Sequence, residues 1–246
     1  ATFGTWLTLD SLHSARVLAR SGFDWLTVDM EHSAIDWSQA AAIMAVVADA
    51  GCVPLVRVPE GSLYCIKRAL DAGAWGIVVP MVDTPEQAER AIAAAKYPPL
   101  GRRGAAFGVA HDDYTGGDII AKMQSANDEI LLMAQIETEY GLENVDAIAA
   151  VEGIDILWIG HFDLTNFMGI PGQFTSDAYL DAVKRVVAAC EKHGKVAGIM
   201  VADAATGKAM LDQGFRAVAY SGDLWIYQQA LREGISALRE AASGQN

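Results

Sequence analysis

Residues 25–32 read Trp-Leu-Thr-Val-Asp-Met-Glu-His, an apolar segment that stops in two carboxylates and an imidazole. Its first four residues are typical of a buried strand, and ionisable groups where such a strand ends are unfavourable unless they are paired or used. Three further apolar segments end in polar groups, at Arg57, at residues 135–137 and at residues 160–163. Several strand ends that meet in one place predict the site of a parallel α/β enzyme.

Outward from this segment, short apolar runs alternate with longer alanine-rich stretches along the whole chain. The sequence predicts eight strands, at residues 4–9, 25–28, 54–58, 76–79, 130–136, 155–159, 196–201 and 217–221. It predicts helices at residues 11–21, 37–50, 64–72, 85–96, 142–150, 178–193, 204–213 and 225–242. Two stretches, 97–127 and 166–176, break this alternation and are expected to be irregular loops.

Eight strands that alternate with helices predict a single (β/α)8 barrel over residues 1–246, with its site at the carboxyl ends of the strands. Glycine follows several of the predicted helices directly before the next strand, as at many helix ends. The alternative is an open, doubly wound sheet. That fold favours a glycine-rich phosphate turn after the first strand, and residues 8–11 contain no glycine.

The composition restricts the class of protein. The chain has 246 residues, is 52% hydrophobic and carries a formal net charge of −13. This acidity argues against binding to nucleic acid or to an anionic membrane, although it leaves an anionic small substrate open. Three scattered cysteines indicate reduced thiols, and neither a membrane-length apolar run nor a signal sequence is visible. We therefore expect a soluble, cytoplasmic protein.

Two acids suggest a metal site. Glu137 follows the fifth predicted strand and Asp163 the sixth, and the ends of adjacent parallel strands lie close together. Two carboxylates with open positions suit Mg²⁺ or Mn²⁺, with Co²⁺ as a further option. Zinc is disfavoured, because no two His or Cys residues have ligand spacing. The alternative interpretation is that both acids cap the helices that follow them.

Arg57 and His32 are the candidate reactive groups. An arginine at the end of an apolar strand needs an anion, which is either a substrate oxyanion or a structural carboxylate such as Asp29 or Glu31. A carboxylate beside His32 would raise its basicity and make it a general base. His161, next to Asp163, could act in the same way or bind the end of the substrate.

The lysines argue against a Schiff-base mechanism. None of the seven follows a predicted strand, and such a mechanism needs a desolvated lysine that points into the site. Carbanion chemistry here would therefore depend on a metal.

At these residues the chain resembles the HpcH/HpaI family of metal-dependent pyruvate aldolases over nearly its whole length. The matching phrases are Gly-Phe-Asp-Trp at 22–25, Asp-Met-Glu-His at 29–32, Val-Arg at 56–57, Leu-Asp-Ala-Gly at 70–73, Val-Pro-Met-Val at 79–82, Tyr-Pro-Pro at 97–99 with Gly101 and Arg103-Gly104, Gln-Ile-Glu-Thr at 135–138, and Gly160 with Asp163-Leu164. Their order and spacing make the resemblance specific.

The resemblance implies a (β/α)8 barrel whose last helix packs on a neighbouring subunit, in a hexamer built as a trimer of dimers. It implies Glu137 and Asp163 as ligands of a divalent metal. It implies that His32, Arg57 and Asp71 are catalytic, with His32 as the base, Arg57 as the stabiliser of the enolate, and Asp71 raising the basicity of His32 across a subunit boundary. From the residues themselves we add Asp29 to the catalytic set, since with Glu31 it is expected to orient His32 and to balance the charge of Arg57. Substrate contacts are implied at Gln135, Gly160, His161, Phe162, Asp163 and Arg57.

The chain departs from the family pattern at residues 160–165, which read Gly-His-Phe-Asp-Leu-Thr. Many relatives have proline and a small residue before the Asp-Leu-Ser of this segment. The larger Phe162 and the ionisable His161 are expected to reshape the pocket, which leaves the aldehyde open.

The resemblance implies reversible retro-aldol cleavage of a 4-hydroxy-2-oxo acid to pyruvate, or a close 2-oxo acid, and an aldehyde. The first alternative is oxaloacetate decarboxylation at the same site. The second alternative is a non-catalytic protein that binds 2-oxo acids. The complete set of candidate site residues argues against it.

Overall fold

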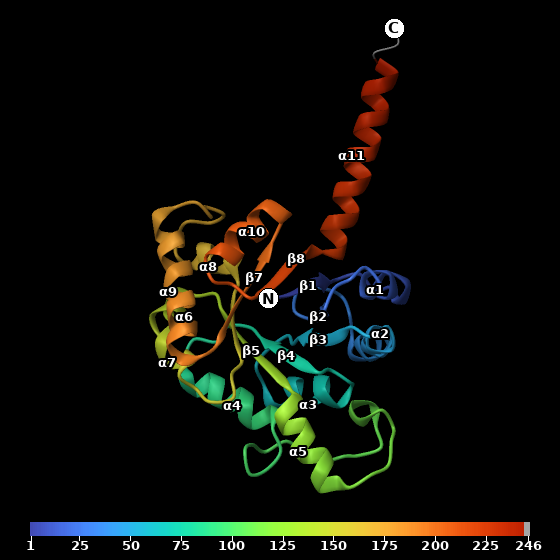
Figure 1. Cartoon of the computed structure of the whole chain (residues 1–246), viewed down its shortest axis with the longest axis vertical. Coiled ribbons are helices and arrows are strands. Elements are labelled where there is room, and N and C mark those ends of the chain that lie inside the picture. The colour runs from blue at the N-terminus through green and yellow to red at the C-terminus, as the bar shows by residue number, and fades with distance from the viewer. Residues whose placement is uncertain (244–246) are drawn as a thin grey trace.

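The computed structural model describes residues 1–243, which form one closed barrel of eight parallel strands in chain order, surrounded by helices (Figure 1). The strands are β1 (Thr2–Leu7), β2 (Trp25–Asp29), β3 (Val53–Arg57), β4 (Gly76–Val79), β5 (Leu131–Ile136), β6 (Ile156–Ile159), β7 (Val196–Val201) and β8 (Ala217–Gly222). The predicted (β/α)8 fold is confirmed. The first strand lies at residues 2–7 rather than 4–9, while the other strand bounds differ from the predicted ones by at most one residue.

The helices are α1 (Leu12–Ala19), α2 (Trp37–Asp49), α3 (Leu63–Asp71), α4 (Pro85–Ala95), η1 (Ala110–Asp112), α5 (Ile119–Glu129), α6 (Glu139–Glu143), α7 (Val145–Ala149), α8 (His161–Phe167), α9 (Asp177–His193), α10 (Ala204–Asp212) and α11 (Asp223–Ser243). The expectation that residues 97–127 form only an irregular loop was wrong, because α5 begins within them. This helix buries none of its residues, so its sequence lacks the apolar stripe by which a packed helix is predicted.

The core has two layers. The outer layer packs the outward side chains of the strands against the helices, and the inner layer fills the barrel. Trp158 packs edge-to-face against both Trp6 and Trp25 inside the barrel, with ring centroids 5.8 Å apart in each pair. A Cβ on Gly4 would lie 2.1 Å from the ring of Trp25, so this position has to be glycine. The barrel interior is therefore a packed core, which leaves the strand ends for chemistry.

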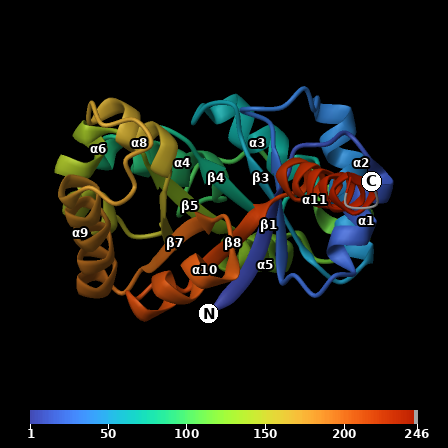
Figure 2. The same ribbon diagram turned by 90° about the horizontal axis from the view of Figure 1, so that it is seen from above.

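The last helix stands apart from the barrel. Figure 1 shows α11 extending away from the other elements, and Figure 2 shows the same helix foreshortened, seen from above. Asp223 at its first position is its only buried residue. The Asp223 carboxylate accepts hydrogen bonds from the backbone N–H groups of Thr8 at 2.9 Å, Leu9 at 3.0 Å and Leu224 at 2.8 Å. One carboxylate thus fixes the base of α11 to the chain that follows β1. Among residues 1–243, no helix is long and apolar enough to span a bilayer.

Candidate active site

The ends of β2 and β3 form one electrostatic unit. The parallel register places Asp29 beside Arg57, and the guanidinium donates to both carboxylate oxygens, from Nε at 3.0 Å and from Nη2 at 2.6 Å. Its third nitrogen, Nη1, lies 3.2 Å from Oε2 of Glu31. The Asp29 side chain is only 2% exposed, so a two-pronged bond of this kind strongly fixes the guanidinium. Arg57 therefore pairs with both of the acids named as its structural partners, Asp29 and Glu31. Its action on a substrate oxyanion stays a prediction.

The same carboxylate shapes the turn that carries His32. Oδ1 of Asp29 accepts the backbone N–H groups of Glu31 at 3.1 Å and His32 at 3.2 Å, and the Ser33 hydroxyl donates to the Asp29 carbonyl. The imidazole itself lies beside Glu31, with Nε2 3.6 Å from Oε2. Asp29 therefore orients His32 through the backbone, and Glu31 is the acid that faces its ring. The His32 side chain is 57% exposed, which leaves it open to a substrate.

Trp6 supports Arg57 from inside the barrel. The guanidinium carbon lies 4.4 Å from the centroid of the Trp6 ring, and this ring is 4% exposed. A cation over an indole face is attracted by the negative potential of the ring. Trp6 Nε1 is buried and has no hydrogen-bond partner among the described residues.

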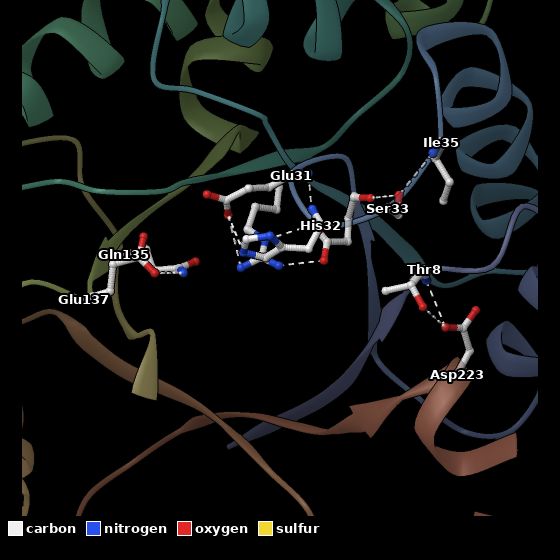
Figure 3. Close-up of polar contacts among 10 residues, drawn as sticks. Thr8, Glu31, His32, Ser33, Ile35, Gln135, Glu137 and Asp223 are labelled. Carbon is white, nitrogen blue, oxygen red and sulfur yellow. Dashed lines mark hydrogen bonds and ion pairs between the residues drawn. The ribbon is translucent and has the colours of Figure 1, made fainter. Parts of the chain in front are cut away.

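Glu137 lies on the opposite side of the barrel mouth, at the end of β5. Oε1 accepts the backbone N–H of Met81 at 2.7 Å, and Oε2 accepts Nε2 of Gln135 at 2.5 Å. Met81 adopts a left-handed φ of 55°, which is unusual for a residue with a side chain. Figure 3 shows Gln135 and Glu137 on one side and Glu31 and His32 on the other. The two groups of polar residues thus come from separate strands and face a common region.

Gly160 permits the close packing around Glu137. A Cβ on this residue would lie 2.4 Å from Oε2 of Glu137 and 2.9 Å from Nε2 of Gln135. Asp163 follows Gly160 in the first turn of α8, for which Gly160 is the N-cap residue. Thr138, not Glu137, caps α6. The interpretation that both acids serve as helix caps therefore does not hold.

Burial makes Glu137 a carboxylate that needs a partner. Desolvation raises its pKa to about 7, and Glu31 and Asp163 add to this effect through their negative charges. Desolvation also raises the pKa of Glu31, partly offset by the positive charge of Arg57. Gln135 Oε1, a further buried acceptor, has no described partner. The β5–β6 side of the site thus has oxygen acceptors and excess negative charge, which suits a hard cation.

A divalent cation fits this donor set. Among the described residues, no cluster of three or more His, Cys, Asp or Glu side chains is arranged to hold a metal. Glu137 and Asp163, the pair that the resemblance implies, would leave the remaining positions of such a cation to water and substrate. Mg²⁺ commonly binds in this way, through one or two carboxylates.

His161 and Phe162 begin α8 beside these acids. Burial lowers the pKa of His161 to about 4, despite the charge of Asp163, so its imidazole is neutral at neutral pH. The ring of His161 packs against Phe162 at 4.6 Å and against Phe174 at 5.1 Å between centroids. His161 therefore occupies an aromatic environment, which makes it a poor candidate for the base.

Asp71 lies away from the other site residues. It is the last residue of α3, which runs back from the end of β3 towards the start of β4. Asp71 Oδ1 accepts Nη2 of Arg103 at 2.8 Å, and this arginine side chain is 1% exposed. No ion pair or hydrogen bond of the described residues joins Asp71 to His32. The role that the resemblance implies for Asp71 stays a prediction.

Sequence reasoning did not anticipate the contacts that three residues make in these groups. Trp6 supports Arg57, Met81 supplies an N–H to Glu137, and Arg103 binds Asp71. In the sequence, Trp6 is indistinguishable from an ordinary residue of the hydrophobic core. The only sequence signal for the other two was their place in the phrases that carry the family resemblance.

The raised pKa of Glu137 predicts an unusual pH dependence of stability in metal-free protein. The folded state keeps this proton up to about pH 7, whereas an unfolded glutamate loses it near the ordinary value of 4.5. Glu137 alone therefore makes stability fall as the pH rises from about 4.5 to 7, by at most about 3 kcal/mol. His161 acts in the opposite direction, because its pKa is lowered from 6.5 to about 4 and stability rises as the unfolded imidazole loses its proton. Urea unfolding of chelator-treated wild-type and Glu137→Gln protein across this range separates the two effects. Glu137→Gln should remove the falling contribution, so its stability should rise more steeply with pH than that of the wild type. Equal slopes in both proteins would contradict the assignment.

Comparison with known proteins agrees with this geometry. The sequence model of the HpcH/HpaI aldolase/citrate lyase family matches residues 2–230. The chain is 37% identical to the hydroxypyruvate/pyruvate aldolase of Roseobacter denitrificans, over 90% of this chain and 86% of that protein. It is also 37% identical to the 2-keto-3-deoxy-L-rhamnonate aldolase of Klebsiella pneumoniae, over 93% of this chain and 85% of that protein.

The fold comparison gives the same result. The crystal structure of an HpcH/HpaI aldolase from Desulfitobacterium hafniense superimposes with a TM-score of 0.94 at 33% identity, covering 98% of this chain and 93% of that one. These relatives are carbon–carbon lyases by name, and the family supports a divalent metal as the cofactor. The chain belongs to the HpcH/HpaI aldolase/citrate lyase family.

Proposed function

We propose that this enzyme catalyses reversible retro-aldol cleavage of a 4-hydroxy-2-oxo acid to pyruvate, or a close 2-oxo acid, and an aldehyde. The observation that carries the proposal is the pair of facing groups at the barrel mouth (Figure 3). One group contains an exposed imidazole beside a fixed guanidinium, and the other contains the buried carboxylate of Glu137, whose pKa the charge of Asp163 helps to raise. Cleavage needs both a proton acceptor and positive charge for an enolate.

His32 acts as the base. In the cleavage direction it takes the proton of the C4 hydroxyl, the C4–O bond becomes a carbonyl, and the C3–C4 bond breaks. The electron pair of that bond moves into the enolate of pyruvate, which then takes a proton at C3. Glu31, 3.6 Å from Nε2 of His32, stabilises the imidazolium that forms in between.

Arg57 stabilises the charge that develops on the 2-oxo oxygen. Its guanidinium is held by Asp29 and Glu31 and is 11% exposed, so it is already oriented before substrate arrives. Preorganised donors of this kind contribute most where water is excluded.

Glu137 and Asp163 would hold the divalent cation, and Gln135 fixes Glu137 through its side-chain amide. When bound there, Mg²⁺ or Mn²⁺, with Co²⁺ as a substitute, would supply the positive charge that binds the carboxylate and oxo group of the substrate. Backbone and side-chain groups of Gly160, His161 and Phe162 line the same side.

The assembly proposed for this enzyme is a homo-oligomer, a hexamer built as a trimer of dimers. The apolar side chains of α11 include Leu231, Ile235 and Leu238, which are 55%, 48% and 69% exposed. Their spacing of four and three residues forms one stripe, which suits packing on a second copy. The end of α3 that carries Asp71 lies away from the carboxyl ends of the strands of the same chain. Its proposed action is therefore on the His32 of another copy.

Removal of the metal tests the proposed function. Chelator-treated enzyme should release no pyruvate from 4-hydroxy-2-oxo acids, and Mg²⁺, Mn²⁺ or Co²⁺ should restore the activity. Borohydride added with pyruvate should trap no adduct, because no lysine ends a barrel strand. Full activity without metal, or a trapped lysine adduct, would refute the proposed mechanism.

His32→Ala separates cleavage from decarboxylation. Without its base the enzyme should lose retro-aldol activity by roughly 10²- to 10⁴-fold, because general base catalysis contributes about this much. Decarboxylation of oxaloacetate needs the enolate stabiliser but no base at a hydroxyl group, so it should persist. Parallel assays of both reactions make the measurement. If both activities fell equally, His32 would act in a step that both reactions share, and its assignment as the base at the C4 hydroxyl would be contradicted. A wild-type protein that binds oxalate or pyruvate but cleaves no substrate would instead be a binding protein.

A further inference from the structure

Four aromatic rings connect the barrel mouth to the core on the β6 side. Phe162 packs on His161 at 4.6 Å and perpendicular to Phe174, with centroids 5.2 Å apart and an angle of 86°. Phe174 packs in turn on Tyr179 of α9 at 5.7 Å. Tyr179 is 5% exposed, so the inner end of this row of rings is anchored in the core.

Phe162 is the outer end of the row. Its side chain is 60% exposed, although its neighbours on both sides in the sequence are partly buried. It precedes Asp163, so the Cα atoms of the two residues lie about 3.8 Å apart. An exposed ring held by two aromatic neighbours, one residue from a proposed metal ligand, offers a substrate an apolar surface at little entropic loss.

The segment that builds the β5–β6 side of the mouth supplies no positively charged side chain. No lysine or arginine occurs between Lys122 and Lys184, a stretch that contains β5, β6, α8 and the start of α9. The same stretch contributes Glu137 and Asp163. The cation described at the mouth, Arg57, is paired with Asp29 and Glu31 on the opposite side. The proposed cation would balance these two acids, so a substrate carboxylate lying over α8 would meet the ring of Phe162 and no basic side chain of this stretch.

We infer that Phe162 sets the acceptor specificity and selects aldehydes with an uncharged, apolar chain over aldehydes that carry a terminal carboxylate. This inference rests on the proposed aldolase function and names its substrate class. In the synthetic direction, C3 of the pyruvate enolate bonds to the aldehyde carbon, and the aldehyde oxygen takes a proton to become the C4 hydroxyl. The rest of the aldehyde then lies against the ring of Phe162.

A matched pair of aldehydes tests the inference. Pentanal and 5-oxopentanoate have the same chain length and differ only in a terminal methyl or carboxylate group. With Mg²⁺-loaded enzyme and pyruvate, kcat/KM for pentanal should exceed that for 5-oxopentanoate by about tenfold or more. Phe162→Ala should remove most of this preference. Phe162→Arg should reverse it by raising kcat/KM for 5-oxopentanoate. Phe167→Ala is the matched control, since Phe167 is also on α8 and 49% exposed but belongs to none of the ring pairs above.

A second measurement separates this inference from the proposed function. Exchange of the pyruvate methyl protons with deuterated water, followed by NMR, reports enolate formation without any aldehyde. Absence of exchange in the wild-type enzyme would overturn the proposed function and this inference together. Exchange accompanied by an equal or higher kcat/KM for 5-oxopentanoate would overturn this inference alone. A wild-type preference for pentanal over 5-oxopentanoate in both Phe162→Ala and Phe162→Arg would also overturn it.

Discussion

Arg57→Ala is expected to lower kcat/KM for retro-aldol cleavage by about 10³-fold and to destabilise the fold at the same time. The loss of activity follows from removing the donor that faces the developing enolate, since a single such donor commonly contributes about 10²- to 10³-fold. The loss of stability follows from Asp29, which is 2% exposed and would keep a buried charge without its partner. Breaking a buried pair in this way costs about 3–5 kcal/mol.

Urea unfolding and steady-state kinetics on the same preparations measure both effects. Arg57→Lys keeps the charge but cannot form the two-pronged bond, so it should recover part of the stability and little of the activity. The double variant Asp29→Asn, Arg57→Ala removes the unpaired charge and should be more stable than Arg57→Ala alone. Wild-type stability in Arg57→Ala would mean that the pair contributes nothing to the fold.

Gly160→Ala should be nearly as damaging to activity, although it adds a single methyl group. The new Cβ would lie 2.4 Å from Oε2 of Glu137 and 2.7 Å from its Cβ, so the carboxylate has to move. Gly160 has a φ of −84°, which any residue can adopt, so the effect comes from the close contacts with Glu137 and Gln135 and not from backbone strain. A displacement of about 1 Å in a reacting group can lower the rate by about 10²-fold.

Metal titration by calorimetry and the retro-aldol assay check this expectation. Metal affinity and kcat should fall together, while the far-ultraviolet circular dichroism spectrum stays that of the wild type. Gly116→Ala is the control, because no atom lies within 4 Å of its added Cβ. Wild-type metal affinity in Gly160→Ala would separate Glu137 from the cation site.

The fold could be predicted from the sequence because its elements repeat. Each strand is a short apolar run, and each packed helix has an apolar side, so the alternation was visible without any contact information. α5 was missed because it buries none of its residues in its own chain. The short helix α8 was missed because its residues had been interpreted only as candidate ligands and contacts.

The identity of the site residues could be predicted better than their contacts. Asp29, His32 and Arg57 were expected together because all three follow apolar runs at strand ends. Their pairing could not be read from the sequence. Asp29 meets the backbone of His32 rather than its ring, because the chain turns directly after β2 and places two N–H groups over the carboxylate. The support of Arg57 by Trp6 depends on the register of β1, which no local pattern reveals.

The double use of Asp29 has a consequence for how such an enzyme can evolve. One carboxylate positions both the guanidinium of Arg57 and the turn that carries His32, so a mutation that shifts either group disturbs the other. The residues on the β2–β3 side of the mouth therefore depend on one another and are expected to tolerate few substitutions. Phe162 has no such link to Arg57 or to His32. New substrate ranges are accordingly expected to arise by substitution on the β6 side, where a lineage can change the acceptor and keep the chemistry.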